Sequence, residues 1–116
     1  MSLEQVLVNL LLNARDSIRG QPPGAPRRIR LRARPAGAGQ VSIEVADTGP
    51  GLDPAILPRL FEPFVTTKPA GEGLGLGLSV SHGLVRSMGG TITARNAPEG
   101  AVFTVTLPCA MAMAPA

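Results

Sequence analysis

Apolar residues recur every three or four positions near the start of the chain, which is the spacing of one face of a helix. Ser2 is suited to cap this helix, which we expect to end at about Arg19. The repeating positions are Leu3, Val6, Leu7, Leu10, Ala14 and Ile18. Additional apolar residues at Val8, Leu11 and Leu12 widen the stripe, so we expect the helix to be packed on most of its sides.

A different pattern follows the proline and glycine residues of 20–26, which break the helix. Ile29, Leu31 and Ala33 alternate with arginines, the period of a strand with one buried face and one wet face. A second strand is predicted at 41–46, after a turn that contains Pro35, Gly37 and Gly39. The segments 28–34 and 41–46 are therefore expected to form a hairpin.

The second half of the chain predicts two helices and another strand pair. The helices are expected at 54–60 and 78–88, and the second one is stopped by Gly89 and Gly90. The strands are expected at 91–95 and 102–107. This order predicts an α+β fold, with helices packed on one face of a mixed sheet. We expect one domain over 1–108 and a disordered tail over 109–116.

Composition narrows the function classes. The net charge is +3, and much of the positive charge lies in the arginine-rich strand at 28–34. That strand could bind nucleic acid, but the alternation favours a solvated strand face, and aromatic stacking residues are missing from it. The single cysteine, Cys109, excludes an internal disulfide. Neither a membrane span nor a signal peptide is predicted, so we expect a cytoplasmic chain without direct membrane contact.

Three polar residues share one face of the first helix. Asn9 and Asn13 are four positions apart, and Asp16 follows three positions later. A buried amide without a partner costs about 1 to 3 kcal/mol, so these side chains need a ligand or a polar network. The alternative is that both amides bind to the backbone of neighbouring loops.

Asp47 ends the second strand and precedes Thr48, Gly49, Pro50 and Gly51. Glycines allow the backbone of this turn to approach a flat ligand, and the carboxylate can accept a hydrogen bond from an exocyclic amine. Adenine offers such an amine, whereas guanine offers a carbonyl oxygen at the same edge. Alternatively, Asp47 only caps the turn, as aspartates before glycine often do.

Four glycines alternate along the chain just before the helix at 78–88, and their amides could receive phosphate oxygens: Gly71, Gly73, Gly75 and Gly77. The segment is neither a P-loop nor a Rossmann fingerprint. A mobile surface loop is the simpler explanation of the glycines alone. Thr66, Thr67 and Lys68 precede them on the same segment, and Lys68 could reach a phosphate.

Four short motifs in order resemble the catalytic and ATP-binding domain of histidine kinases, within the superfamily of gyrase, heat-shock chaperone and mismatch-repair ATPases. They are VNLLLNA at 8–14, which resembles the N box; DTGPG at 47–51, the first glycine box; FEPF at 61–64, the F box; and GLGLGL at 73–78, the second glycine box. The resemblance covers nearly the whole chain. It implies a two-layer α/β sandwich of the Bergerat type with a mostly antiparallel sheet and a glycine-rich ATP lid.

The resemblance also implies a role for each matching residue. Asn13 would bind Mg²⁺ through its carbonyl oxygen, and Asn9 would support the phosphate end of the site as the second catalytic residue. Asp47 would select adenine. The remaining residues implied to bind nucleotide are Asp16, Gly49, Gly51, Phe64, Thr67, Lys68, Gly73, Leu74, Gly75, Leu76 and Gly77. Leu74 departs from the small polar residue that is usual there.

The implied activity is transfer of the ATP γ-phosphoryl group to a histidine on a separate helical dimerisation domain, and from there to a response regulator. His82, the only histidine, lacks an acidic neighbour typical of an acceptor motif, so we interpret it as structural. Hydrolysing relatives carry a glutamate where Asn9 stands, and an amide cannot act as a general base. A nucleotide-sensing module without transferase activity and a nucleic-acid-binding domain are the alternatives.

Overall fold

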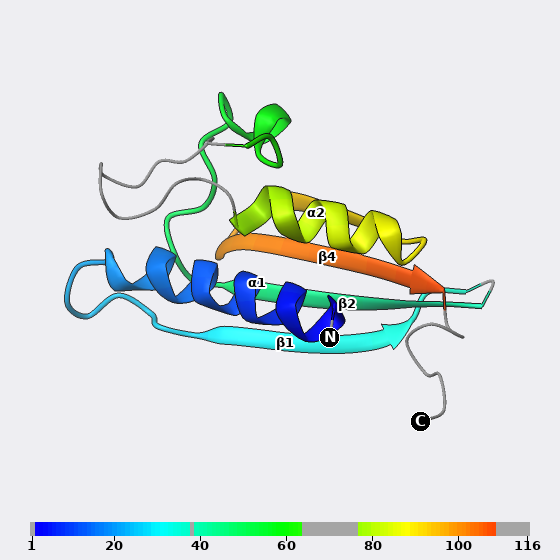
Figure 1. The fold of residues 1–116 in the computed structure, drawn as a ribbon. Coiled ribbons are helices and arrows are strands. Elements are labelled where there is room, and N and C mark those ends of the chain that lie inside the picture. Colours follow the sequence, from blue (N-terminus) through cyan, green and yellow to red (C-terminus); the bar gives the residue numbers. More distant parts are fainter. Residues whose placement is uncertain (1, 38, 64–76, 109–116) are drawn as a thin grey trace.

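The computed structural model describes residues 2–37, 39–63 and 77–108, with the side chain of Ser2 left out. The elements, in chain order, are α1 (Ser2–Arg19), β1 (Ile29–Pro35), β2 (Gln40–Asp47), the short 3-10 helix η1 (Leu57–Arg59), α2 (Gly77–Ser87), β3 (Thr91–Ala97) and β4 (Gly100–Pro108) (Figure 1). The predicted order is confirmed. The helix predicted at 54–60 is reduced to η1, in which Pro58 has no amide hydrogen to donate.

The four strands form one sheet in the order β1-β2-β4-β3, and every neighbouring pair of these strands is antiparallel. Both predicted hairpins, β1–β2 and β3–β4, are present. β4 lies between β2 and β3 in the sheet, so the two hairpins are joined where β2 of the first pairs with β4 of the second. The predicted α+β class is confirmed.

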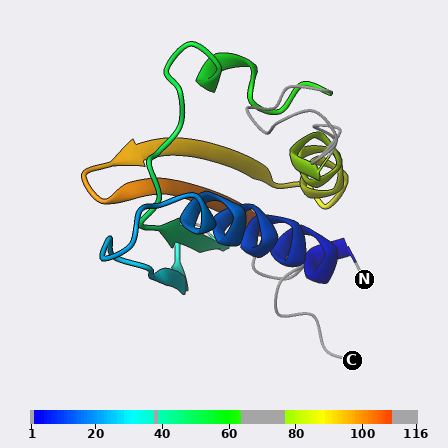
Figure 2. The same cartoon turned by 90° about the vertical axis from the view of Figure 1, so that its left-hand side faces the viewer.

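The core lies between one face of the sheet and the two helices, which cover that same face (Figures 1 and 2). Residues of α1 spaced four apart are buried, as the helical pattern predicts. They pack in one cluster with inward-facing residues of β2 and β4 and with Val85 of α2. The main members are Val6, Leu10, Ala14, Val45, Phe103, Val105 and Leu107.

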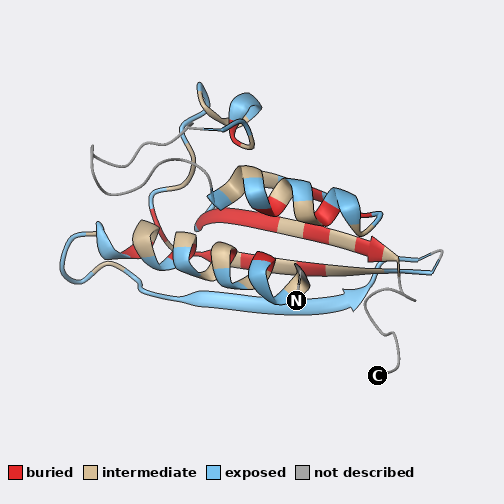
Figure 3. Cartoon of the chain, viewed as in Figure 1, coloured by how far each residue is buried: buried red, intermediate tan, exposed pale blue. Residues whose placement is uncertain are grey.

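The outward face of α1 is less covered than its sequence suggests. Val8 is 48% exposed and Leu12 is 43% exposed, so the prediction that α1 is packed on most of its sides is wrong. The reason is that the sheet covers one side of α1 and α2 lies beside it, which leaves the side away from the sheet open (Figure 3). No helix in the described segments is long and apolar enough to cross a membrane.

β1 is exposed along its whole length (Figure 3). Its apolar residues share the helix-covered face with their partners on β2, yet Leu31 remains 53% exposed. The prediction of a half-buried strand is therefore wrong. Because β1 lies at the edge of the four-stranded sheet, α1 packs mainly over β2 and does not cover the inner face of β1.

Candidate functional site

Asn9 joins α1 to the first turns of α2. Its side-chain amide Nδ2 donates to the hydroxyl of Ser81 at 3.1 Å and to the carbonyl oxygen of Gly77 at 3.4 Å. Its Oδ1 accepts a hydrogen bond from Gln5 Nε2 at 3.0 Å. Both ends of the amide are thus engaged, and the predicted phosphate-end residue lies directly beside the N-terminus of α2.

Asn13 lies one turn further along the same face of α1. Its side chain is partly buried, and it makes no hydrogen bond to any residue that the structure describes. A side-chain carbonyl oxygen is therefore open at this position. Such an oxygen is a neutral ligand of the kind that Mg²⁺ accepts together with phosphate oxygens and water. No group of three or more His, Cys, Asp or Glu side chains suited to a metal ion occurs within the described segments.

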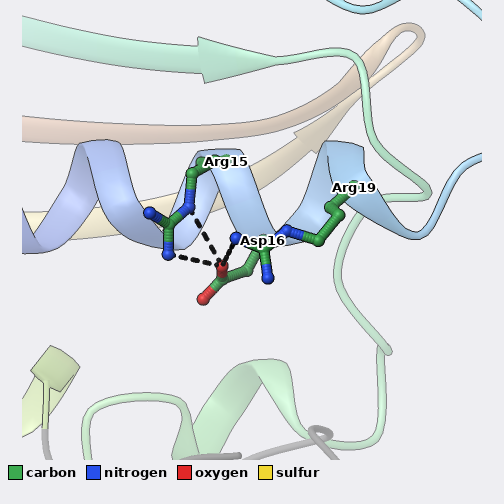
Figure 4. Close-up of polar contacts among 3 residues, drawn as sticks. All are labelled: Arg15, Asp16 and Arg19. Carbon is green, nitrogen blue, oxygen red and sulfur yellow. Dashed lines mark hydrogen bonds and ion pairs between the residues drawn. The ribbon is translucent and has the colours of Figure 1, made fainter.

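Asp16 continues the face towards the end of α1, where two arginines surround its carboxylate (Figure 4). Arg15 donates to Oδ1 from Nη2 at 3.1 Å and from Nε at 3.3 Å, and Arg19 Nη2 lies 3.8 Å from the same oxygen. All three side chains are at least partly exposed, so these ion pairs contribute little stability. They bring two guanidinium groups to the end of the polar stripe.

Asp47 is held at the end of β2 with only 5% of its surface exposed. Its Oδ1 accepts from the backbone amide of Gly49 at 2.8 Å and lies 3.5 Å from the hydroxyl of Ser17, which is on α1. Its Oδ2 has no hydrogen-bond partner among the described residues. Since no fully buried side-chain oxygen or nitrogen in that part of the chain lacks a partner, Oδ2 keeps access to solvent. One acceptor is therefore fixed and the other is open.

The two glycines of the turn after Asp47 have distinct reasons to be glycine. A Cβ on Gly49 would collide with the side chain of Ser17, so this glycine lets the turn pass directly over α1. Gly51 has a φ of 85°, in the left-handed region that side chains disfavour, and a Cβ there would lie 2.9 Å from Asn96 Oδ1. Both are nucleotide-binding candidates, and both are needed for the shape of the turn.

Polar contacts from three directions hold this turn in place. Asn96 of β3 accepts from the Leu52 amide at 2.7 Å and donates to the Leu52 carbonyl at 2.9 Å. Gln21 donates to the Thr48 carbonyl oxygen at 2.9 Å, and the Thr48 hydroxyl donates to the Pro26 carbonyl oxygen at 2.8 Å. The backbone around Asp47 is thus fixed before any ligand binds.

Phe61, which opens the F box motif, packs against both layers. Its ring stacks on His82 of α2 with a centroid distance of 5.4 Å and meets Phe103 of β4 edge-on at 6.4 Å. His82 is thereby part of the packing between α2 and the chain before it. This arrangement supports the structural interpretation of His82.

Seven predicted site residues lie outside the described residues: Phe64, Thr67, Lys68, Gly73, Leu74, Gly75 and Leu76. Among those that are described, Asn9 and Gly77 meet at the start of α2, and Asn13 follows Asn9 one turn along α1. Asp47, Gly49 and Gly51 lie near the end of α1. The backbone amides at the start of α2 carry the positive end of its dipole, which favours anions. An acceptor for an amine at one end and an anion-favouring helix start at the other suit a nucleoside phosphate.

Four supporting residues were not predicted: Gln5, Ser17, Ser81 and Asn96. Ser17 could have been found, because it is four positions after Asn13 and eight after Asn9 on the same helix. Ser81, although fully buried, gives no signal in the sequence, since its role depends on α2 lying beside α1. Asn96 likewise acts on a turn more than forty residues away.

The family comparison agrees with the class of site that this geometry defines. Residues 1–111 match the family described as histidine kinase-, DNA gyrase B- and HSP90-like ATPases. The chain is 56% identical over 109 residues to the two-component sensor PprA of Pseudomonas aeruginosa, covering 93% of this chain and 12% of PprA. It belongs to this ATPase family, in its histidine-kinase branch.

Solved structures show the same fold. Full-length ShkA in complex with AMPPNP superposes with a TM-score of 0.78 at 34% identity, covering 92% of this chain and 21% of ShkA. The catalytic domain of the histidine kinase ThkA superposes with a TM-score of 0.76 at 30% identity, covering 92% of this chain and 66% of that domain. The chain spans only about an eighth of the length of PprA and about a fifth of that of ShkA.

Proposed function

We propose that this chain is the ATP-binding catalytic domain of a sensor histidine kinase and donates the γ-phosphoryl group of ATP to a histidine on a separate helical dimerisation domain. A response regulator would then receive the group. The observation that carries the proposal is the position of Asn9 beside the start of α2, with Asn13 one turn further along α1 and the open carboxylate oxygen of Asp47 near the end of that helix. Residues 1–108 would form the catalytic unit.

The hydrogen bonds of Asn9 favour transfer over hydrolysis. A general base must accept a proton, and an amide does not. Moreover, Oδ1 of Asn9 already accepts from Gln5, and Nδ2 donates to Ser81 and Gly77. Water beside the γ-phosphate is therefore not activated by this residue, and a positioned histidine is the better nucleophile.

Asn13 is proposed as the protein ligand of Mg²⁺, because its side-chain oxygen is open and neutral. When bound, the ion would neutralise charge on the phosphate oxygens. Asp16 lies one turn further along, with its charge partly balanced by Arg15 and Arg19. We assign it to the outer phosphate region and not to the metal.

Asp47 is proposed to select adenine by accepting from its exocyclic amine at Oδ2, while Gly49 and Gly51 shape the adjoining wall. The start of α2 at Gly77 would face the phosphates. The predicted lid residues Phe64, Thr67, Lys68, Gly73, Leu74, Gly75 and Leu76 complete the proposed binding set from outside the described segments.

The decisive experiment incubates the chain with γ-labelled ATP and Mg²⁺, with and without the helical acceptor domain of its full-length kinase. Alone, the chain should bind ATP but gain almost no acid-labile phosphate and release little free phosphate. The added domain should become labelled, at a rate well below that of the joined protein, because proximity is lost. A variant of that domain without its acceptor histidine is the control.

Three outcomes would contradict the proposal. Rapid release of free phosphate, abolished by Asn13→Ala, would make the chain a hydrolase. Stable labelling of His82 would place the acceptor within the chain. Tight ATP binding without any labelling of the acceptor domain would favour a nucleotide-sensing module.

A further inference from the structure

The face of the sheet that points away from both helices carries a concentration of arginines. The strand register places Arg30 opposite Ala46, Ala46 opposite Val102, and Val102 opposite Arg95, so that two arginines from the outer strands flank a small apolar floor. Arg32 and Arg34 follow on the same side of β1, since alternate residues of a strand share a face. We call this surface, formed by Arg30, Arg32, Arg34 and Arg95 with the residues between them, the arginine face.

The arginine face is concave. A depression of about 200 Å³ is lined by all four arginines, by Glu44 and Glu99, and by the floor between them. Val102 is only 6% exposed although neither α1 nor α2 covers this side, which indicates that the long side chains around it shield the floor. The depression also touches Asp47, whose carboxylate points to Ser17 on the opposite side of the sheet.

The charge of this surface is only half balanced. Arg34 pairs with Glu44 at 3.5 Å and Arg30 with Glu99 at 3.8 Å. Arg32 and Arg95 have no ion pair among the residues that the structure describes, and they lie on opposite outer strands. One guanidinium group without an ion pair among the described residues therefore lies on each side of a floor of small side chains.

We propose that the arginine face binds an acidic segment of a partner protein. Guanidinium groups match carboxylates through paired, parallel hydrogen bonds. Arg32 and Arg95 lie on strands three spacings apart, about 14 Å at roughly 4.8 Å per strand, which is close to the separation of residues four apart in an extended chain. The partner segment would lie over Ala46 and Val102, with acidic side chains reaching Arg32 and Arg95.

The composition of the surface favours an acidic protein over nucleic acid. Two glutamates lie among the arginines. A peptide can place uncharged residues beside them, whereas a nucleic-acid backbone carries a negative charge at every nucleotide and would be repelled there. Among the described residues, no aromatic side chain lines the depression, so these residues offer bases no ring on which to stack. The surface also lies on the opposite side of the sheet from the carboxylate of Asp47, so an acidic partner and a nucleotide can be bound together.

The test measures anisotropy of a fluorescein-labelled peptide of alternating glutamate and serine, with a glutamine and serine peptide as the uncharged match. The glutamate peptide should bind at low salt and weaken as salt is raised. Arg32→Glu and Arg95→Glu should each reduce affinity about two- to fivefold, the range expected for exposed ion pairs. Arg86→Glu makes the same charge change at an exposed residue of α2, on the other side of the sheet, and should have less than a roughly twofold effect.

A second variant separates specific recognition from simple charge. Arg95→Lys keeps the charge but lacks the guanidinium fork, so it should bind the peptide less tightly than the native chain. The proposal is overturned if the peptide does not bind, if Arg86→Glu weakens binding as much as Arg32→Glu, or if Arg95→Lys binds as well as the native chain. Tighter binding of a single-stranded or duplex oligonucleotide through the same arginines would overturn it in favour of a nucleic-acid surface.

Discussion

The carboxylate of Asp47 has one oxygen engaged by the Gly49 amide and one oxygen open. In Asp47→Asn, the remaining carbonyl can still accept from Gly49, but the open acceptor is replaced by a donor. The variant should fold and should bind ATP more weakly by about 1.5 to 3 kcal/mol, the scale of a charged hydrogen bond. Calorimetric titration with ATP and GTP measures this. Equal affinity of the native chain for the two nucleotides would refute the assignment.

Asn13 should act through the metal, because its side-chain oxygen is open and carries no charge. Asn13→Ala should erase most of the difference between nucleotide affinities measured with Mg²⁺ and with a chelator. Affinity in the presence of the chelator should change little. If the variant still binds ATP more tightly with Mg²⁺, to the same extent as the native chain, another group holds the metal.

At this scale the sequence predicts the residues of the proposed site better than the residues that support them. Asn9, Asn13 and Asp47 were predicted because helical spacing and a strand-to-glycine junction are local patterns. Ser81 and Asn96 contact residues that are more than forty positions away. Such contacts depend on how elements are placed in space, which a local pattern does not contain.

At the scale of the elements, the contact between α1 and α2 should contribute both to the stability of the fold and to the affinity for nucleotide. Ser81→Ala removes a fully buried hydroxyl and leaves Asn9 Nδ2 with only the Gly77 carbonyl, which is 3.4 Å away. The free energy of unfolding should fall by about 0.5 to 1.5 kcal/mol. ATP binding should weaken as well, because the start of α2 is no longer held against Asn9.

Ser87→Ala is the matched control, since that hydroxyl is exposed and donates only to the Leu84 carbonyl within α2. Urea unfolding and ATP titration of the two variants give the comparison. An equal loss of stability in both, or normal ATP affinity in Ser81→Ala, would show that the link between Asn9 and Ser81 does not organise the site.

The ends of the elements could be predicted from prolines and glycines in the sequence. Which elements are covered by others could not be predicted in this way. The described strand ends and the ends of α2 fall within two residues of their predicted positions, because prolines and glycines mark them in the sequence. The alternation of Ile29 and Leu31 with arginines is the same for an edge strand as for a central one. Only the sheet order shows that β1 is at the edge, where α1 does not reach.

For the whole molecule, bound nucleotide should stabilise the fold, since the proposed site draws on α1, α2 and the turn after β2. At a concentration of ATP with Mg²⁺ of 100 times the dissociation constant, the gain is about 2.7 kcal/mol. For a domain of this size the melting temperature should rise by roughly 10 °C. Scanning calorimetry with ATP, GTP and no nucleotide tests this, and an equal rise with GTP would contradict selection of adenine.

The exposure of β1 also bears on solubility. β1 has seven residues, and no described strand pairs with its outer edge. Such an edge can pair with the same edge of another molecule and begin an aggregate. Charged side chains oppose such stacking, and Pro35, which lacks an amide donor, ends the strand. Arg30→Thr combined with Arg32→Thr should therefore increase light scattering as concentration rises, whereas Arg86→Thr should not. Beyond any partner that they bind, the arginines of β1 would therefore oppose edge-to-edge association between copies of the chain.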